Sequence, residues 1–292
     1  MEAVCILNPA AGRGTAPHKW KQARNDLAAR GRIIDTLTTT GPGDAARLTR
    51  QLIAQGADTI IAAGGDGTLN EIAGAAAGSE IKVALAPFGT GNDLARGLGI
   101  PRRSSEWAAG FLTFTARQLD LGMVNGRYFI NQAGFGFDAR VGYKVNTGVG
   151  FLTGKPAYLA AVASCLKDLS PVEAEIVVDG VRIKQKVILA AFANSVFIGG
   201  GLRLAPPAIP DDGLLDLVVI GEVSRLELLK AFPMLFSGSH LNHPAVSVWR
   251  GKSFSLHSDK PEYAHTDGEI YKTDRLEVNI KPGSLNFLAP LY

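Results

Sequence analysis

A glycine-rich turn directly after an apolar run is the feature that most constrains how this chain can fold. The run Thr59–Ala63 contains no charged residue, as expected for a strand that is covered on both faces of a sheet. It continues into Gly64-Gly65-Asp66-Gly67-Thr68, and the following residues to Ala77 have the composition of a helix. Strand, glycine turn and helix in that order predict a βαβ unit, and the free amides at the start of such a helix attract anions.

The same alternation of strand and helix covers the first 120 or so residues and predicts a parallel sheet. The other strands expected in this region are Ala3–Leu7, Arg32–Thr38 and Val83–Pro87. The other helices expected are one from a Thr15 N-cap to Gly31, Asp44–Gln55 and Asn92–Leu98.

After about residue 120 the pattern changes to short runs bounded by turn residues, which indicates a mainly antiparallel second domain. Asp179-Gly180 separates Glu175–Val178 from Val181–Val187 and predicts a tight hairpin. Further strands are expected at Leu214–Ile220, Ala245–Trp249, Phe254–His257 and Leu276–Ile280. Helices are expected at Pro156–Leu169 and after Ser224, where Glu227 completes a capping box.

Composition and charge exclude several classes of protein. The 292 residues carry 30 Lys and Arg against 27 Asp and Glu, a net charge of +3 that does not indicate nucleic acid as a partner. The two cysteines, Cys5 and Cys165, are too few and too far apart for a disulfide framework or a structural zinc site. The N-terminus lacks a signal-peptide pattern, and no apolar run can cross the roughly 30 Å core of a bilayer. We therefore expect a cytoplasmic protein, with a peripheral position on the inner face of the membrane left open.

Three more loops are expected at the same edge of the sheet as the Gly64–Thr68 turn. Asn8–Gly14 follows the first strand, Thr38–Thr40 ends the second, and Pro87–Asp93 ends the fourth. In open α/β sheets ligands bind at this carboxyl edge. The loops bring amides, hydroxyls and carboxylates to one crevice, and none has the Gly-Lys-Ser/Thr ending of a Walker A motif.

These segments resemble the diacylglycerol kinase catalytic domain family, which includes bacterial soluble diacylglycerol kinases, YegS-type lipid kinases, sphingosine kinases and ceramide kinases. The matching motifs are Asn8-Pro9 with Gly12, Gly64–Glu71, Pro87–Asp93, Asp211–Asp216 and Asp267-Gly268-Glu269. The resemblance implies an α/β fold whose N-terminal domain is Rossmann-like, as in NAD kinases and phosphofructokinases, and binds nucleotide. Residues 1–122 would form it, with 284–292 returning to it. Residues 123–283 would form an antiparallel β-sandwich for the lipid, and the active site would lie between the two.

The resemblance also implies ligand contacts. The positions that match the family's ATP site are Asn8, Pro9, Ala10, Ala11, Gly12, Thr40, Gly65, Asp66, Gly67, Thr68, Leu69, Asn70, Glu71 and Thr90. A structural Mg²⁺ would be held by the carbonyls of Ile209 and Leu214 and the carboxylate of Asp212, an oxygen set that suits this ion. Taken alone, this segment is more typical of a plain turn before a strand. Asp120 is expected to order water and Mg²⁺ beside Asp66, and a cap at the end of a strand stays open as an alternative.

Asp267-Gly268-Glu269 supplies the carboxylates for catalysis. Phosphoryl transfer needs alignment, charge neutralisation and a group that takes the proton of the acceptor alcohol. By resemblance Glu269 is that group, with Asp267 beside it, and Asp66 and Asp267 stay open as alternatives. We expect Asp267 and Glu269 to end a strand of the second domain, where alternation points both into one cleft. Without the motifs of the first domain, the same residues would be an ordinary hairpin turn. Asp138 also falls where the family carries an acid.

We therefore expect an ATP- and Mg²⁺-dependent lipid kinase that phosphorylates a hydroxyl of diacylglycerol or of a related glycerolipid or sphingoid lipid. The apolar stretches Val149–Phe151 and Phe232–Phe236 are candidates for its acyl site. One alternative is an NAD kinase-like enzyme or another kinase of a soluble substrate. Another is a regulator that binds nucleotide or lipid without catalysis. The expected partners are a lipid alcohol and an anionic membrane surface, without nucleic acid, and a homodimer stays open.

Overall fold

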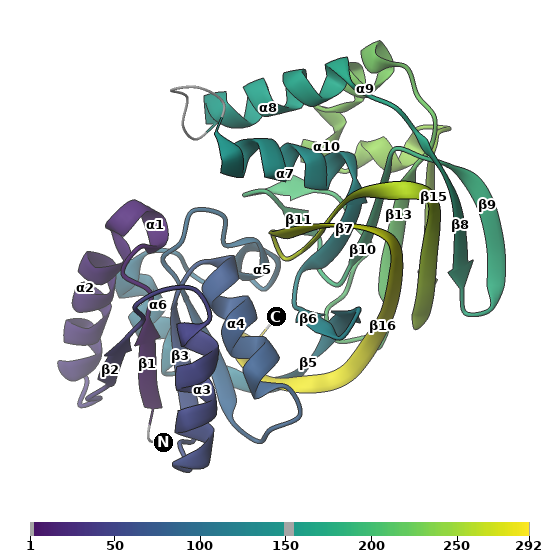
Figure 1. The fold of residues 1–292 in the computed structure, drawn as a ribbon. Coiled ribbons are helices and arrows are strands. Elements are labelled where there is room, and N and C mark those ends of the chain that lie inside the picture. The colour runs from purple at the N-terminus through teal and green to yellow at the C-terminus, as the bar shows by residue number, and fades with distance from the viewer. Residues whose placement is uncertain (1–2, 149–154, 292) are drawn as a thin grey trace.

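The computed structural model describes residues 3–148 and 155–291, which form two lobes (Figure 1). The first lobe has four parallel strands in the order β2-β1-β3-β4, and the second has mainly antiparallel strands. The α/β fold class expected from the sequence is confirmed. Because β5 and β16 pair across both lobes, one sheet of 14 strands runs through the molecule.

The first lobe is a three-layer α/β structure. Its strands are β1 (Ala3–Leu7), β2 (Asp35–Thr38), β3 (Thr59–Gly64) and β4 (Lys82–Pro87). Its helices are α1 (Ala11–Gly14), α2 (Ala16–Ala28), α3 (Asp44–Ala54), α4 (Asp66–Ala76), α5 (Asp93–Gly97) and α6 (Ser104–Phe111). On one side of the sheet α2 packs against α6, and on the other α3 packs against α4 (Figure 1).

The second lobe is larger, and its elements follow in chain order. Its strands include β5 and β16, which it shares with the first lobe. In chain order they are β5 (Thr115–Val124), β6 (Arg127–Phe129), β7 (Gln132–Gly136), β8 (Val172–Val178), β9 (Val181–Val187), β10 (Leu189–Ala193), β11 (Phe197–Ile198), β12 (Leu202–Arg203), β13 (Leu215–Ile220), β14 (Val246–Gly251), β15 (Ser253–Thr266) and β16 (Glu269–Ala289). Its helices are α7 (Phe137–Thr147), α8 (Lys155–Lys167), α9 (Arg225–Ala231), α10 (Met234–Ser237) and the short 3₁₀ helix η1 (Ser239–Asn242).

The strand β15 belongs to both layers of the second lobe. Its residues 254–258 pair with β8, and its residues 264–266 pair with β7, with an irregularity between His257 and Glu262. Apolar side chains from both layers meet in one core, where Phe192 and Phe254 make an edge-to-face contact at 5.5 Å between ring centroids. A strand that changes layer at an irregularity is typical of packed β-sheets.

Most of the expected elements are present, and the differences have physical reasons. The second strand begins at Asp35 rather than Arg32, because its pairing with β1 begins at Val4 and Asp35. Ile33 is 87% exposed, whereas Ile34 is buried. Thr15 does precede α2, but its hydroxyl donates to the Gly12 carbonyl instead of capping the helix. The capping box of Ser224 and Glu227 at α9 is confirmed.

Strand β16 is 21 residues long and connects the lobes. It pairs with β15 near its start, with β5 along much of its length, and its residues Asn286–Leu288 pair in parallel with β4. Phe287 lies in this last segment and is fully buried in the core of the first lobe. None of the helices in the described ranges has the length and apolar character needed to cross a membrane.

Removal of the Phe287 ring is expected to destabilise the protein strongly. Phe287→Ala leaves a cavity where β16 joins β4 and β5, so the free energy of unfolding should fall by about 3–5 kcal/mol. Urea denaturation followed by tryptophan fluorescence measures this change, since Trp20 and Trp107 belong to the same core. The control Ile33→Ala removes an exposed side chain and should stay within about 0.5 kcal/mol of the parent. Equal losses in both variants would contradict this assignment of the core.

Candidate functional site

A cleft of about 630 Å³ lies at the carboxyl ends of the parallel strands. The order β2-β1-β3-β4 reverses direction between β1 and β3, which is where open α/β sheets bind ligands. The loops after all four strands line this cleft, and Asp267 and Glu269 reach it from the second lobe. The predicted ATP positions that line it are Asn8, Pro9, Ala10, Ala11, Gly12, Thr40, Gly65, Gly67, Thr68, Asn70, Glu71 and Thr90.

Two predicted ATP positions lie elsewhere. Leu69 is fully buried in the core, and its amide donates to the Gly65 carbonyl, so it is not brought to the cleft. Asp66 lines a neighbouring cavity of about 450 Å³ instead. The helical geometry of α4 explains both positions, because the helix begins at Asp66 and successive side chains point in different directions around its axis.

The start of α4 presents backbone amides to the cleft. No side chain caps this helix, so its first N–H groups lack an intrahelical partner and are available to an anion. A Cβ atom built at Gly67 meets no atom within 4 Å, because it would stand in the open cleft. The arrangement suits a group such as phosphate, whose oxygens accept hydrogen bonds.

The glycines of neighbouring loops are required for packing. A Cβ atom on Gly89 would lie 2.3 Å from the Gly65 Cα atom, and one on Gly12 would lie 2.3 Å from the Phe88 carbonyl oxygen. Gly12 also has φ +60°, a conformation that favours glycine. The three phosphate-accessible loops therefore support each other through backbone contacts that no side chain could enter.

Polar side chains fix the shape of the cleft. Asn8 donates to the Thr68 hydroxyl at 2.9 Å and accepts from the Ala10 amide at 3.0 Å, which joins the loops after β1 and β3. Glu71 accepts hydrogen bonds from the amides of Gly43 and Ala45 at the start of α3. Glu71 lines the cleft but uses its carboxylate to hold the loop after β2.

Asp66 is held by the loop after β4. Its two carboxylate oxygens accept from the amides of Asn92 and Asp93 at 2.7 and 2.8 Å. Asp93 lies beside it, bonded to Arg96 and to the amide of Gly200 in the second lobe. Burial raises the pKa of Asp93, and the charge of Asp66 raises it further. Sequence reasoning did not select Asp93, although it ends the Pro87–Asp93 motif.

Asp267 and Glu269 do not lie on one strand, so the expected alternation is wrong. They flank Gly268 in the tight turn between β15 and β16, where Asp267 has φ +43° and Gly268 has φ +92°. The sequence pattern of a hairpin turn is therefore correct for the backbone. The turn nevertheless brings both carboxylates to the cleft.

The Asp267 carboxylate sits in a cradle of backbone amides. It accepts hydrogen bonds from Ile130 at 2.7 Å, Gln132 at 2.9 Å and Asn131 at 3.1 Å. Burial nevertheless raises its pKa to about 6, against the lowering effect of these amides and with a further contribution from Asp66. Glu269 differs from it, because its side chain is 65% exposed and its ion pair with Arg127 is 3.8 Å long.

His265 and Asp138 form a second pair of titratable groups next to the cleft. His265 Nε2 lies 3.0 Å from Asp138 Oδ2, and the Gly268 amide donates to His265 Nδ1 at 3.4 Å. Burial lowers the pKa of His265, but the charges of Asp138 and Asp267 outweigh it and the net shift is upward. The imidazole thus connects the Asp267–Glu269 turn to the first turn of α7.

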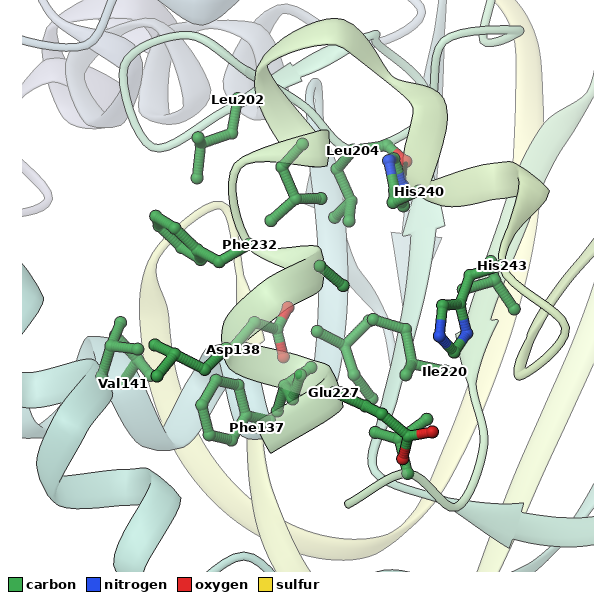
Figure 2. A pocket seen from close by; sticks show the side chains of 18 of the residues that line it. Phe137, Asp138, Val141, Leu202, Leu204, Ile220, Glu227, Phe232, His240 and His243 are labelled. Atoms are coloured by element: carbon green, nitrogen blue, oxygen red, sulfur yellow. Dashed lines mark hydrogen bonds between the residues drawn. The ribbon is translucent and has the colours of Figure 1, made fainter. Parts of the chain in front are cut away.

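A third cavity, in the second lobe, is almost wholly apolar (Figure 2). Its lining comes from α7, α8, β10, β13, α9 and α10, and includes Phe137, Val141, Leu204, Ile220 and Phe232. Its polar groups are Asp138, Glu227, His240 and His243. Of the stretches suggested as acyl lining, Phe232 and Leu235 contribute to this cavity, Phe236 is exposed, and Val149–Phe151 lies outside the described residues.

The residues predicted to bind metal form a separate cluster. Asp120 does not line the cleft beside Asp66, because its carboxylate accepts from the amides of Gly213 at 2.6 Å and Gly283 at 2.7 Å. Burial raises the pKa of Asp120, and the charges of Asp212 and Asp211 add to the shift. Asp212 accepts from the Leu214 amide and pairs with Arg250, while Ile209 is half exposed.

This cluster has features that suit a cation. Asp216 is buried, and neither of its carboxylate oxygens has a hydrogen-bond partner, although Arg250 lies 3.2 Å from one of them. Within the cluster, the described carboxylates are those of Asp120, Asp211, Asp212 and Asp216, against the guanidinium groups of Arg117 and Arg250. The described residues nevertheless contain no set of three or more His, Cys, Asp or Glu side chains arranged around one metal position.

The carboxyl group of Asp267 is expected to titrate near pH 6. The folded chain binds this proton more tightly than the unfolded chain, so Asp267 lowers the free energy of unfolding as the pH rises from about 4 to about 6. Carboxyl ¹³C NMR of aspartate-labelled protein measures the titration, and Asp267→Asn identifies the resonance. A titration at or below pH 4 would show that the amide cradle outweighs burial.

Comparisons with known proteins agree with this geometry. The diacylglycerol kinase catalytic domain model matches residues 2–124, and the YegS C-terminal NAD kinase beta sandwich-like domain model matches residues 131–289. The chain is 32% identical to the diacylglycerol kinase of Bacillus subtilis, over 91% of this chain and 89% of that protein. It is 31% identical to the diacylglycerol kinase of Mycobacterium tuberculosis, over 99% and 95% of the two chains.

A lipid kinase and a solved structure extend the comparison. A protein of Pseudomonas fluorescens described as a YegS-like lipid kinase is 32% identical, over 99% of this chain and 95% of its own. The crystal structure of a protein from Bacillus anthracis described as a diacylglycerol kinase has a TM-score of 0.79 and 25% identity, and the match covers 99% of this chain and 97% of that one. The chain therefore belongs to the family of diacylglycerol kinases and YegS-like lipid kinases, and it is a lipid kinase that uses ATP.

Proposed function

We propose that the chain transfers the γ-phosphoryl group of ATP to a hydroxyl of diacylglycerol or of a related glycerolipid or sphingoid lipid. The observation that carries this proposal is that the three cavities lie next to one another and share lining residues. The middle cavity shares Thr90 and Asp267 with the glycine-lined cleft, and it shares Asp138 and Ile198 with the apolar cavity. ATP phosphates would occupy the glycine-lined cleft, and the acyl chain of the lipid would occupy the apolar cavity. The γ-phosphoryl group and the lipid hydroxyl would then meet at the carboxylates between them.

The nucleotide's phosphates fit the cleft end of this path. The amides at the start of α4, together with the loops after β1 and β4, offer donors to their oxygens. Catalysis of phosphoryl transfer depends mainly on positioning and charge stabilisation, and these loops are held rigidly by the contacts of Gly12, Gly65 and Gly89. In this proposal Glu71 and Thr40 shape the cleft.

Glu269 is the proposed proton acceptor. The carboxylate oxygens of Asp66 and Asp267 accept hydrogen bonds from backbone amides, which hold both side chains in place and leave fewer lone pairs for a substrate. Glu269 lines the same cleft and is held by no backbone amide in the described part of the chain. Its freedom suits a group that must reach the alcohol only when the substrate is bound.

Two further elements belong to the proposal. Mg²⁺ would bind at the Asp212 cluster through Asp212 and the carbonyls of Ile209 and Leu214, and the buried Asp216 carboxylate, whose oxygens accept no hydrogen bond and whose Oδ1 pairs with Arg250, supports a cation there. Arg250 would then leave Asp212.

A cytoplasmic location is proposed because ATP is supplied there. A homodimer stays a prediction.

Replacement of Glu269 tests the function and the assignment of the base together. Glu269→Gln keeps the shape of the side chain but cannot accept a proton, so kcat should fall by about 10²–10⁴-fold while the Kd of ATP barely changes. Phosphate transfer from radiolabelled ATP to diacylglycerol, monoacylglycerol, phosphatidylglycerol, ceramide, sphingosine and NAD measures the rate and the acceptor. Asp66→Asn is the matched variant and should weaken ATP binding as well as turnover, because it releases the loop of Asn92.

Three outcomes would change the interpretation. If Glu269→Gln keeps parental turnover and Asp66→Asn loses only turnover, Asp66 is the base. If the parent phosphorylates NAD and no lipid, the soluble-substrate alternative is correct. ATP binding without transfer to any acceptor would favour the regulator.

Loss of the Asp212 carboxylate tests the metal. If Mg²⁺ binds there, it should raise the Tm of the parent but not of Asp212→Ala, since a ligand bound only by the folded state stabilises it by mass action. The variant should also have a lower Tm than the parent at saturating Mg²⁺. Differential scanning fluorimetry with Mg²⁺, and with Na⁺ at the same ionic strength, measures both effects. An equal response of the two proteins to Mg²⁺ would exclude this site.

A further inference from the structure

The segment α9–α10 is apolar on both of its sides. Leu228, Phe232 and Leu235 line the apolar cavity (Figure 2 labels Phe232), while Leu226 and Phe236 are 60% and 62% exposed. A helix that covers a core normally presents a polar outer face to water. The outer apolar side chains of α9–α10 therefore need another explanation than packing.

The apolar cavity reaches the surface at this segment. Leu229 lines the cavity and is also 54% exposed, so its side chain lies at the mouth. The cavity is about 90 Å³ in this structure. An engineered cavity of about 150 Å³ binds benzene, so this cavity must widen before an acyl chain can enter, and α9–α10 forms the wall with exposed apolar side chains.

The charges beside the exposed apolar groups suit an anionic surface. Arg225 and Lys230 flank Leu226 and Leu229 on α9, and neither forms an ion pair with another described residue. The nearby carboxylates are engaged, since Glu227 bonds to the Ser224 amide and Glu222 pairs with Lys186. Leucine and phenylalanine with adjacent Lys and Arg are the composition of helices that lie in the interface of a membrane.

We propose that α9–α10 is the membrane-docking element of this kinase: it inserts Leu226, Leu229 and Phe236 at the surface of an anionic bilayer and admits the lipid there to the apolar cavity. Arg225 and Lys230 would contact the head groups. The hinge residues would be at the ends of the segment, where Ser224 caps α9 and Gly238 adopts φ +83°. The proposal rests on the lipid-kinase function proposed above.

Vesicle binding tests the docking surface without requiring turnover. The full-length protein is sedimented, without ATP, with vesicles of phosphatidylcholine and phosphatidylglycerol or of phosphatidylcholine alone. Leu226→Ser/Phe236→Ser should reduce binding to the anionic vesicles at least tenfold. The matched control Ile33→Ser/Val181→Ser removes two apolar side chains that are 87% and 65% exposed and lie outside α9–α10, and it should bind as the parent does. The parent should bind phosphatidylcholine vesicles more weakly than anionic ones.

Activity on two physical forms of the substrate separates this proposal from the proposed function. Neither substituted residue lines the cavity, so the variant should keep parental kcat and KM on short-chain diacylglycerol dispersed as monomers and lose at least tenfold on long-chain diacylglycerol in vesicles. Absence of activity on both forms in the parent would refute the function, not the docking surface. Unchanged vesicle binding by the variant would refute the docking surface. So would a parental dimer that the substitutions dissociate in analytical ultracentrifugation, because the patch would then be an interface between two copies.

Discussion

The long strand β16 is the constraint on which the rest of the structure depends. Its first residue, Glu269, lies at the cleft, and its last residues complete the sheet of the first lobe beside β4. One hydrogen-bonded strand therefore connects the sheet that shapes the glycine-lined cleft to the turn that carries two of its carboxylates. Backbone pairing of β16 with β15, β5 and β4 therefore links the two lobes directly.

A second principle of the site is the use of backbone groups to place charge. Asp66 is held by the amides of the loop after β4, and Asp267 by three amides around Asn131. The Asp66 carboxylate thereby orders the loop of Asn92, and the Asp267 carboxylate orders the segment around Asn131. Close glycine contacts such as that between Gly65 and Gly89 supply the remaining rigidity. The site is thus preorganised by main-chain geometry, which suits a reaction that depends on alignment.

The sequence predicted the local features well and the long-range ones poorly. The βαβ order, the capping box of α9 and the glycine loops are visible because each is written in neighbouring residues. The pairing of His265 with Asp138 spans 127 positions, and the cradle of Asp267 joins residues more than 130 apart, so no local pattern reports them. The runs Phe254–His257 and Leu276–Ile280 cover only part of the longer strands β15 and β16, which also bury polar residues such as Glu262 and Thr266. The contacts of Asp120 with Gly213 and Gly283 span 93 and 163 positions, so no local pattern reports that the fold brings it near Asp212 and not beside Asp66.

The position of β16 also affects how the protein is made. Strand β4 ends at Pro87, but the strand that pairs with it begins its contact at Asn286, about 200 residues later. At a synthesis rate of about 5–20 residues per second, the edge of β4 stays unpaired for roughly 10–40 s before β16 is available. An unpaired edge with an apolar strand behind it is a template for association with other chains. The edge of β4 in the first lobe therefore has no pairing partner until residues 286–288 have been synthesised.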